Sequence, residues 1–193
     1  MNRAAFLDRD GVINRKAREG EYVTRWEEMQ ILPGVVEAIA LLNRAGFRVI
    51  VISNQRGVAK GLITAADLEA LHRQLCEELV RAGATIDAIY YCPHESEPPC
   101  RCRKPKPGLL FDAAHEHNLD LAASWMIGDS RSDIEAGCNA GCKTVLLIGR
   151  NDSVAGEPDM VAVSLLEGVQ QVLRREEVPA DLSSCRKKPQ GCI

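Results

Sequence analysis

Two segments of the sequence place pairs of aspartates at or just after runs of apolar residues. Asp8 and Asp10 follow the apolar residues 4–7, and Asp129 and Asp133 follow a second apolar run. Carboxylates held close together repel each other, and they stay ionised only where a cation or hydrogen-bond donors compensate the charge. Mg²⁺ prefers such oxygen ligands and keeps coordination positions for a substrate phosphate. Each aspartate could instead cap a turn or a helix, but two such segments together favour a metal site that takes a phosphate.

A second concentration of reactive side chains lies in the loop of residues 92–107. Cys92 and His94 are separated by one residue, and so are Cys100 and Cys102. Three thiolates and one imidazole complete the tetrahedral coordination of a structural Zn²⁺ and leave no position for a substrate. A disulfide or free thiols are the alternatives, but neither explains the histidine. The spacing therefore predicts a structural zinc site.

The elements that must position these residues alternate along the chain. The predicted strands cover residues 4–7, 48–53, 86–91, 125–128, 144–148 and 160–163. The predicted helices cover residues 34–45, 64–82, 107–118, 132–140 and 165–174. The second strand contains a continuous apolar run, which is typical of a strand buried on both faces. This alternation predicts a doubly wound α/β domain with a mostly parallel sheet.

In a doubly wound sheet, the ligand site lies at the carboxyl ends of the strands. Asp8 and Asp10 hold that position after the first predicted strand, and Asp129 holds it after a later one. The second predicted strand leads into Ser53, Asn54 and Gln55. We therefore expect all of these side chains to converge on one site.

The domain organisation follows from where the alternation is interrupted. Residues 13–32 are polar and mixed, which predicts an insertion after the first strand that is too short for a large cap domain. We expect a single domain over residues 1–175. The polar residues 176–193, which include Cys185 and Cys192, are expected to form a mobile tail.

The composition excludes several classes of protein. Hydrophobic residues make up 46% and charged residues 26%, as in soluble globular chains. No apolar run approaches the roughly 18 residues of a membrane span, and none forms the core of a signal peptide. We therefore expect a cytoplasmic protein, in a reducing compartment where clustered thiols bind metal more often than they form disulfides. A net charge of −3 and 4% aromatic residues disfavour nucleic-acid binding, so we expect the substrate to be a small molecule. We also expect the protein to be a monomer.

The motifs, taken in order, resemble the haloacid dehalogenase superfamily of phosphohydrolases. The set comprises Asp8-x-Asp10-Gly-Val, Ser53-Asn54, Lys104 and Gly128-Asp129-x-x-x-Asp133. Asp-x-Asp alone is a weak signal, whereas four motifs in order at plausible spacing are specific. The resemblance implies the Rossmann-like fold of that superfamily and a magnesium-dependent phosphatase.

The resemblance also implies a role for each residue. Asp8 would attack phosphorus to form an aspartyl-phosphate, and Asp10 would protonate the leaving oxygen and then activate water. Mg²⁺ would bind the Asp8 side chain, the Asp10 backbone carbonyl and the Asp129 side chain, while Asp133 would orient the metal site or Lys104. The residues expected to bind the phosphoryl group and the rest of the substrate are Ser53, Asn54, Gln55, Arg103 and Lys104.

The pairing of the Cys/His loop with the Arg103-Lys104-Pro-x-Pro-Gly segment resembles one subgroup of the superfamily. That resemblance implies hydrolysis of the 7-phosphate of D-glycero-D-manno-heptose 1,7-bisphosphate, on the route to ADP-heptose and the lipopolysaccharide core. Histidinol phosphate, from histidine biosynthesis, is the alternative substrate. A different class, an inactive zinc-stabilised interaction module, is disfavoured because all four residues whose loss would favour it are present: Asp8, Asp10, Lys104 and Asp129. The guanidinium of Arg103 favours a substrate with a second anionic group.

Overall fold

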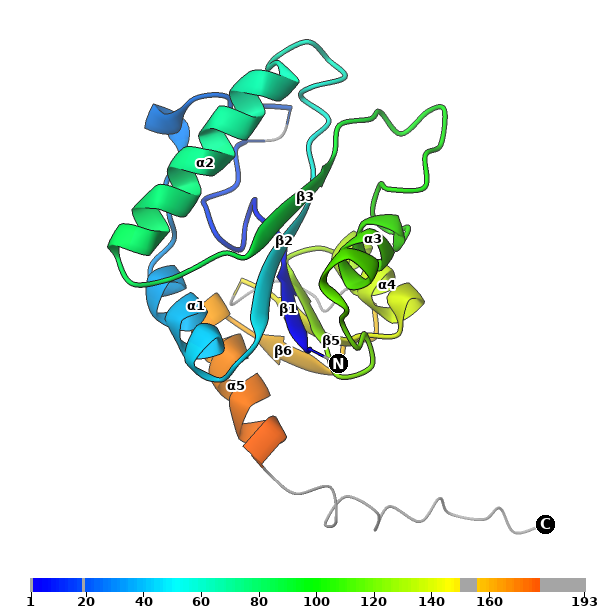
Figure 1. Cartoon of the computed structure of the whole chain (residues 1–193). Coiled ribbons are helices and arrows are strands. Elements are labelled where there is room, and N and C mark those ends of the chain that lie inside the picture. The colour runs from blue at the N-terminus through cyan, green and yellow to red at the C-terminus, as the bar shows by residue number, and fades with distance from the viewer. Residues whose placement is uncertain (1, 19, 150–155, 178–193) are drawn as a thin grey trace, which may run out of the picture.

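The computed structural model describes residues 2–18, 20–149 and 156–177, and a six-stranded sheet forms its centre (Figure 1). The strands are β1 (Ala4–Leu7), β2 (Arg48–Asn54), β3 (Ala88–Cys92), β4 (Trp125–Gly128), β5 (Lys143–Leu147) and β6 (Met160–Ala162). Their order is β3-β2-β1-β4-β5-β6, and every neighbouring pair is parallel. The chain thus winds outward from β1 in both directions, as the alternation of elements predicts.

Different helices cover the two faces of the sheet. The helices are α1 (Val35–Arg44), α2 (Ala65–Arg81), α3 (Gly108–His117), α4 (Arg131–Ala140) and α5 (Leu165–Glu177). In β1, Ala5 and Leu7 join the core formed with α1 and α5, whereas Ala4 and Phe6 join the core formed with α3 and α4. Alternate side chains of a strand point to opposite faces, so a strand with a core on each side must be apolar throughout. Among the described helices, none is long and apolar enough to cross a membrane.

The sheet register brings the expected site residues to one edge. Leu7 pairs with Val51 of β2 and with Ile127 of β4. The chain therefore leaves β1 and β4 at nearly the same level, and β2 continues past that level to Asn54 at the same edge of the sheet. Strands are added on one side of β1 up to β3 and on its other side from β4 onward, so the strand order reverses between β1 and β4. Such a switch point is where α/β sheets bind their ligands.

The insertion after β1 forms a short flap, which we define as residues 15–30. The flap is closed at its base, where Arg15 N donates to Gln30 O at 2.8 Å, and it contains one turn of 3-10 helix, Trp26–Glu28. Val23 and Met29 pack against Leu68 and Leu71 of α2. The flap is thus anchored on α2, and no large cap domain is present in the described residues.

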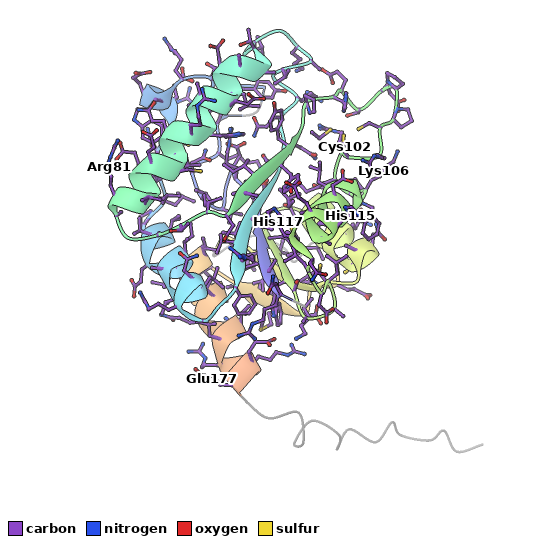
Figure 2. All side chains as sticks on the ribbon, in the orientation of Figure 1. Arg81, Cys102, Lys106, His115, His117 and Glu177 are labelled. Carbon is purple, nitrogen blue, oxygen red and sulfur yellow. The ribbon has the colours of Figure 1, made fainter. Side chains whose placement is uncertain are left out.

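The boundaries of the elements differ slightly from the predicted ones. The largest difference is at α5, which continues to Glu177, labelled in Figure 2. Glu176 accepts hydrogen bonds from Trp125 Nε1 at 3.1 Å and from Lys143 Nζ at 2.8 Å. Residues 176 and 177, which the sequence assigned to the tail, therefore belong to α5. Residues 178–193, with both tail cysteines, lie outside the described residues.

Candidate active site

Three carboxylates meet at the switch point between β1 and β4. Asp8 follows β1, Asp129 follows β4, and Asp133 lies in the first turn of α4. Each contributes a carboxylate oxygen to a group within 4.8 Å of one another. Among the described residues, the buried Asp129 Oδ1 has no hydrogen-bond partner. Crowded carboxylates with an unsatisfied oxygen fit a hard divalent cation such as Mg²⁺.

Two glycines allow the carboxylates to approach the backbone. Gly11 has a φ of +99°, and a Cβ there would lie 2.1 Å from Asp129 Oδ2. A Cβ on Gly128 would lie 2.1 Å from the Cβ of Asp133. Any other residue at either position would push an aspartate out of the cluster.

Lys104 supplies the positive charge at this site. Its ammonium donates to Asp8 Oδ1 at 2.8 Å and pairs with Asp133 Oδ1 at 2.6 Å. Only 3% of its side chain is exposed. Burial alone would lower the pKa of Lys104, but the Asp8 and Asp133 carboxylates raise it above the ordinary value. The lysine therefore stays charged and faces the site where a phosphate would arrive.

The environment of Asp8 sets its ionisation. Burial raises the pKa of Asp8 to about 7, the Asp133 and Asp10 carboxylates add to this, and Lys104 opposes it. A nucleophile must be ionised to attack phosphorus. A divalent cation among these carboxylates would favour the ionised form.

Asp10 is held by four hydrogen bonds. Arg9 Nη2 donates to both carboxylate oxygens at 3.0 and 2.9 Å, and Asn14 Nδ2 and Gln55 Nε2 each donate at 2.9 Å. Although burial raises the pKa of Asp10, the Arg9 charge and these hydrogen bonds bring it below the usual value. The carboxylate is thereby fixed in one orientation, as a proton-transfer group requires.

The residues after β2 lie in the site, but two of them hold protein groups. Asn54 Oδ1 accepts from Lys104 N at 3.1 Å and its Nδ2 donates to Lys104 O at 3.2 Å. Gln55 Nε2 donates to Ser53 Oγ at 2.8 Å as well as to Asp10. In this arrangement Asn54 positions the lysine and Gln55 positions Asp10. Direct donation from Ser53, Asn54 and Gln55 to a phosphate stays a prediction.

The four predicted zinc ligands come together in the loop after β3. Their ligand atoms all lie within 4.8 Å of one another, and the separations from His94 Nδ1 to Cys102 Sγ and from Cys92 Sγ to Cys102 Sγ are both 3.2 Å. A tetrahedron with Zn²⁺ bonds of about 2.0–2.3 Å has edges of about 3.3–3.8 Å. The three cysteines are free thiols. The cluster is therefore compatible with a closed tetrahedral zinc site.

The Cys/His loop leads directly into the cationic segment. Figure 2 shows Cys102 and Lys106 close together on the chain that enters α3. Arg103 lies between them, half-buried, and its Nη1 donates to the backbone oxygen of His94 at 3.3 Å. The position of Arg103 thus depends on the loop that the cluster holds.

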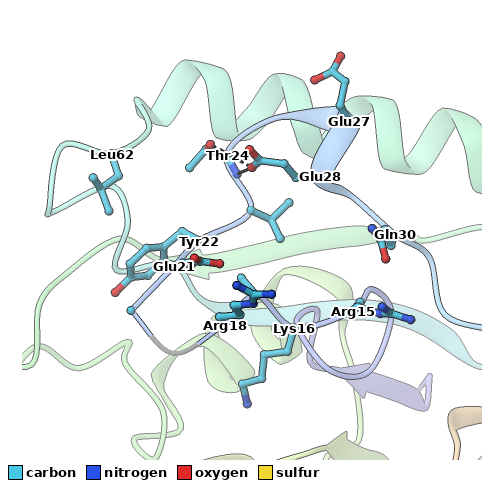
Figure 3. Close-up of a pocket in the computed structure, with 13 residues that line it drawn as sticks. Arg15, Lys16, Arg18, Glu21, Tyr22, Thr24, Glu27, Glu28, Gln30 and Leu62 are labelled. Carbon is cyan, nitrogen blue, oxygen red and sulfur yellow. Dashed lines mark hydrogen bonds between the residues drawn. The ribbon is translucent and has the colours of Figure 1, made fainter.

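Five residues at the site were not predicted from the sequence: Arg9, Asn14, Lys16, Arg18 and His72. Lys16 Nζ reaches from the flap to Asp129 Oδ2 at 2.8 Å. Lys16 and Arg18 line a cavity of about 220 Å³ whose wall also includes Asp10. The same two side chains line a second, larger cavity of about 810 Å³ at the flap (Figure 3). The only sequence signal for Lys16 was its place in the insertion, which has no periodicity. The structure therefore adds two flap cations to the site.

Comparison with known proteins identifies the family. A family model described as HAD-hydrolase-like matches residues 101–168. A D-glycero-beta-D-manno-heptose-1,7-bisphosphate 7-phosphatase of Helicobacter pylori (strain J99) is 42% identical over 151 residues, 78% of this chain and 85% of that protein. The enzyme of that name from Escherichia coli (strain K12) is 34% identical over 187 residues, 92% of this chain and 96% of that protein. The chain belongs to the haloacid dehalogenase superfamily of phosphatases.

Solved structures agree with this placement. The crystal structure of D,D-heptose 1,7-bisphosphate phosphatase from B. bronchiseptica, complexed with magnesium and phosphate, superposes with a TM-score of 0.82 at 36% identity. The superposition covers 90% of this chain and 99% of that chain. These likenesses confirm the predicted superfamily and the Rossmann-like parallel sheet, with no large cap domain among the described residues.

Proposed function

We propose that this haloacid dehalogenase phosphatase hydrolyses the 7-phosphate of D-glycero-D-manno-heptose 1,7-bisphosphate. The products would be phosphate and heptose 1-phosphate, which retains the phosphate needed for later nucleotide activation toward ADP-heptose and the lipopolysaccharide core. The observation that carries the proposal is the contact of Asp8 with Lys104 inside the carboxylate cluster. This contact sets a candidate nucleophile beside a fixed cation in a chain similar to heptose-bisphosphate phosphatases over most of its length.

The reaction divides into two displacements. In the first, a carboxylate oxygen of Asp8 attacks phosphorus, the bond to the sugar oxygen breaks, and Asp10 gives that oxygen a proton. In the second, Asp10 takes a proton from water, the water attacks the aspartyl-phosphate, and inorganic phosphate leaves with Asp8 restored. Lys104 compensates the charge of the phosphoryl oxygens in both steps.

Two metals would serve different purposes. Mg²⁺, held by the Asp8 and Asp129 side chains and the Asp10 carbonyl, would screen the carboxylate from the anionic phosphate. Zn²⁺, held by Cys92, His94, Cys100 and Cys102, would fix the loop that carries Arg103 and Lys104. We also propose, as the sequence predicts, that the protein acts as a monomer in the cytoplasm.

The choice of a bisphosphate rests on the charges around the site. Arg103 beside Lys104 and the flap residues Lys16 and Arg18 add cations beyond the one that the reacting phosphate needs. The short flap leaves room for an extended sugar with a phosphate at each end. Histidinol phosphate carries a cationic amine, which these side chains would repel.

The experiment is a comparison of kcat/KM for heptose 1,7-bisphosphate, histidinol phosphate and p-nitrophenyl phosphate with the magnesium-loaded enzyme. We expect the heptose bisphosphate to rank first. A higher kcat/KM for histidinol phosphate would replace the proposed substrate. Failure to release phosphate from all three would leave an inactive zinc-stabilised module as the explanation.

A further inference from the structure

The side chain of Arg9, which lies between the two aspartates in the sequence, is buried and reaches His72 of α2. Only 1% of the Arg9 side chain is exposed. Its Nη2 donates to both oxygens of Asp10, and its Nη1 lies 3.1 Å from Nε2 of His72 on α2. The three side chains form a chain of contacts from His72, on the buried face of α2, through Arg9 to Asp10, the proton-transfer group of the proposed reaction.

The chemistry of the pair fixes the direction of the hydrogen bond between Arg9 and His72. A guanidinium has only donors, so His72 Nε2 must be the acceptor, and the imidazole must be neutral with its proton on Nδ1. Burial, followed by the charge of Arg9, lowers the pKa of His72 to about 3, which agrees with a neutral ring. The edge of the ring also contacts Tyr91, with centroids 5.7 Å apart.

The guanidinium of Arg9 has few other hydrogen bonds that could orient it. A buried guanidinium is tolerated only where hydrogen-bond partners surround it. Among the described residues, Arg9 Nε has no hydrogen-bond partner, and the Arg9 side chain bonds to the side chains of Asp10 and His72. Because Asp10 is the group to be positioned, His72 is the fixed point that sets the angle of the guanidinium.

We propose that His72 is a positioning residue for the phosphatase reaction, which orients Arg9 and through it fixes the Asp10 carboxylate for both proton transfers. The inference rests on the proposed function, because it assigns Asp10 the proton transfers. Proton transfer requires heavy atoms within about 2.6–3.2 Å. A guanidinium free to tilt would release Asp10 from two of its four hydrogen bonds.

The leaving group separates positioning from a merely structural role. A sugar alkoxide is a poor leaving group, so the sugar oxygen must be protonated as it departs. Nitrophenolate is a good leaving group and departs without a proton. Misplacement of Asp10 must therefore slow the first displacement for a sugar phosphate much more than for p-nitrophenyl phosphate. Loss of stability alone would lower both rates together.

The experiment compares His72→Leu, which removes the acceptor, with His72→Gln, whose amide oxygen can accept from Arg9. First-turnover rates are measured by rapid quench for heptose 1,7-bisphosphate and by the nitrophenolate burst for p-nitrophenyl phosphate. We expect His72→Leu to slow the sugar-phosphate step about tenfold and the aryl-phosphate step less than about twofold, with KM little changed. His72→Gln should recover most of the sugar-phosphate rate.

Two further variants make the result specific. Leu75→Ala deletes a fully buried side chain of α2 that has no polar atoms, and it should lower the melting temperature without changing the ratio of the two rates. In an Asp10→Asn background, His72→Leu should cost less than about twofold, because the group that it positions is already disabled.

Equal slowing of both substrates by His72→Leu, or an unchanged sugar-phosphate rate, would overturn the inference. If His72→Leu does not fold, Arg9→Lys takes its place, since it keeps the charge but loses the two-pronged contact with Asp10, and a full sugar-phosphate rate in that variant would refute the role. A native enzyme that hydrolyses neither substrate would instead reject the proposed function.

Discussion

The carboxylate cluster and the Cys/His loop both bring together side chains that could hold a metal ion, but they do so in opposite ways. The ligands of the loop lie between Cys92 and Cys102, and they form a closed set of four. The carboxylates come from three elements, between Asp8 and Asp133, and the sheet must bring them together. One carboxylate oxygen there has no partner among the described residues. The closed set suits a structural ion, whereas the open set suits an ion that also meets a substrate.

The largest test of this contrast is Asp8→Asn. An amide is a poor nucleophile and a weaker magnesium ligand, so kcat should fall by about 10⁴-fold or more. The zinc content should stay at the native value, because the loop does not depend on the carboxylates. Phosphate release and metal analysis on the same preparation check both parts, and appreciable turnover by the variant would reject the covalent mechanism.

Cys100→Ala should have the opposite pattern. Removal of one ligand opens the tetrahedral set, so zinc should be lost and the loop should no longer hold Arg103 and Lys104 in place. We expect KM for the sugar bisphosphate to rise about 10–100-fold, with a smaller change in kcat. The melting temperature should fall only modestly, because Cys100 packs against the edge of the core formed with α3 and α4 and is not one of its buried members. Stoichiometric zinc in the purified variant would contradict the assigned ligand set.

The same contrast explains what the sequence could predict. The clustering of the four Cys/His residues could be predicted because one local spacing contains all of them. The strand-end aspartates were found because parallel strands share one carboxyl edge, and β1 and β4 have the predicted bounds.

The contacts made across the fold could not be predicted in this way. The meeting of His72 with Arg9 depends on how α2 packs over the sheet, and neither residue's neighbours in the sequence indicate it. The contact of Lys16 with Asp129 depends on the path of an insertion without periodicity. At the other end of the domain, the extension of α5 depends on Glu176 meeting Trp125 and Lys143.

Arg103→Ala should give a smaller effect, on substrate choice. The guanidinium lies next to Lys104 and would bind the second phosphate, so kcat/KM for heptose 1,7-bisphosphate should fall about 10–100-fold, as for loss of a charged hydrogen bond. kcat/KM for p-nitrophenyl phosphate, which has one phosphate, should change less than about twofold. Lys106→Ala, at a nearby exposed cation, is the matched control. An equal fall for both substrates would place Arg103 at the reacting phosphate instead.

The smallest expected effect concerns the pH dependence of stability in the metal-free protein. Burial raises the pKa of Asp8 from 3.8 to about 7 in the folded state. A carboxyl group whose pKa is raised on folding makes its full contribution to stability at pH values below the pKa that it has in the unfolded chain. This contribution is lost as the pH rises through the folded-state pKa of about 7. The metal-free protein should therefore melt a few degrees lower at pH 8 than at pH 5.

Added Mg²⁺, which favours the ionised carboxylate, should raise the melting temperature more at pH 8 than at pH 5. Thermal unfolding with and without Mg²⁺ measures both differences, and Asp8→Asn should reduce them while Glu37→Gln, on the exposed face of α1, should not. A magnesium effect of equal size at the two pH values would show that the cation does not act on Asp8, and the open site would then differ from the Cys/His loop in geometry alone.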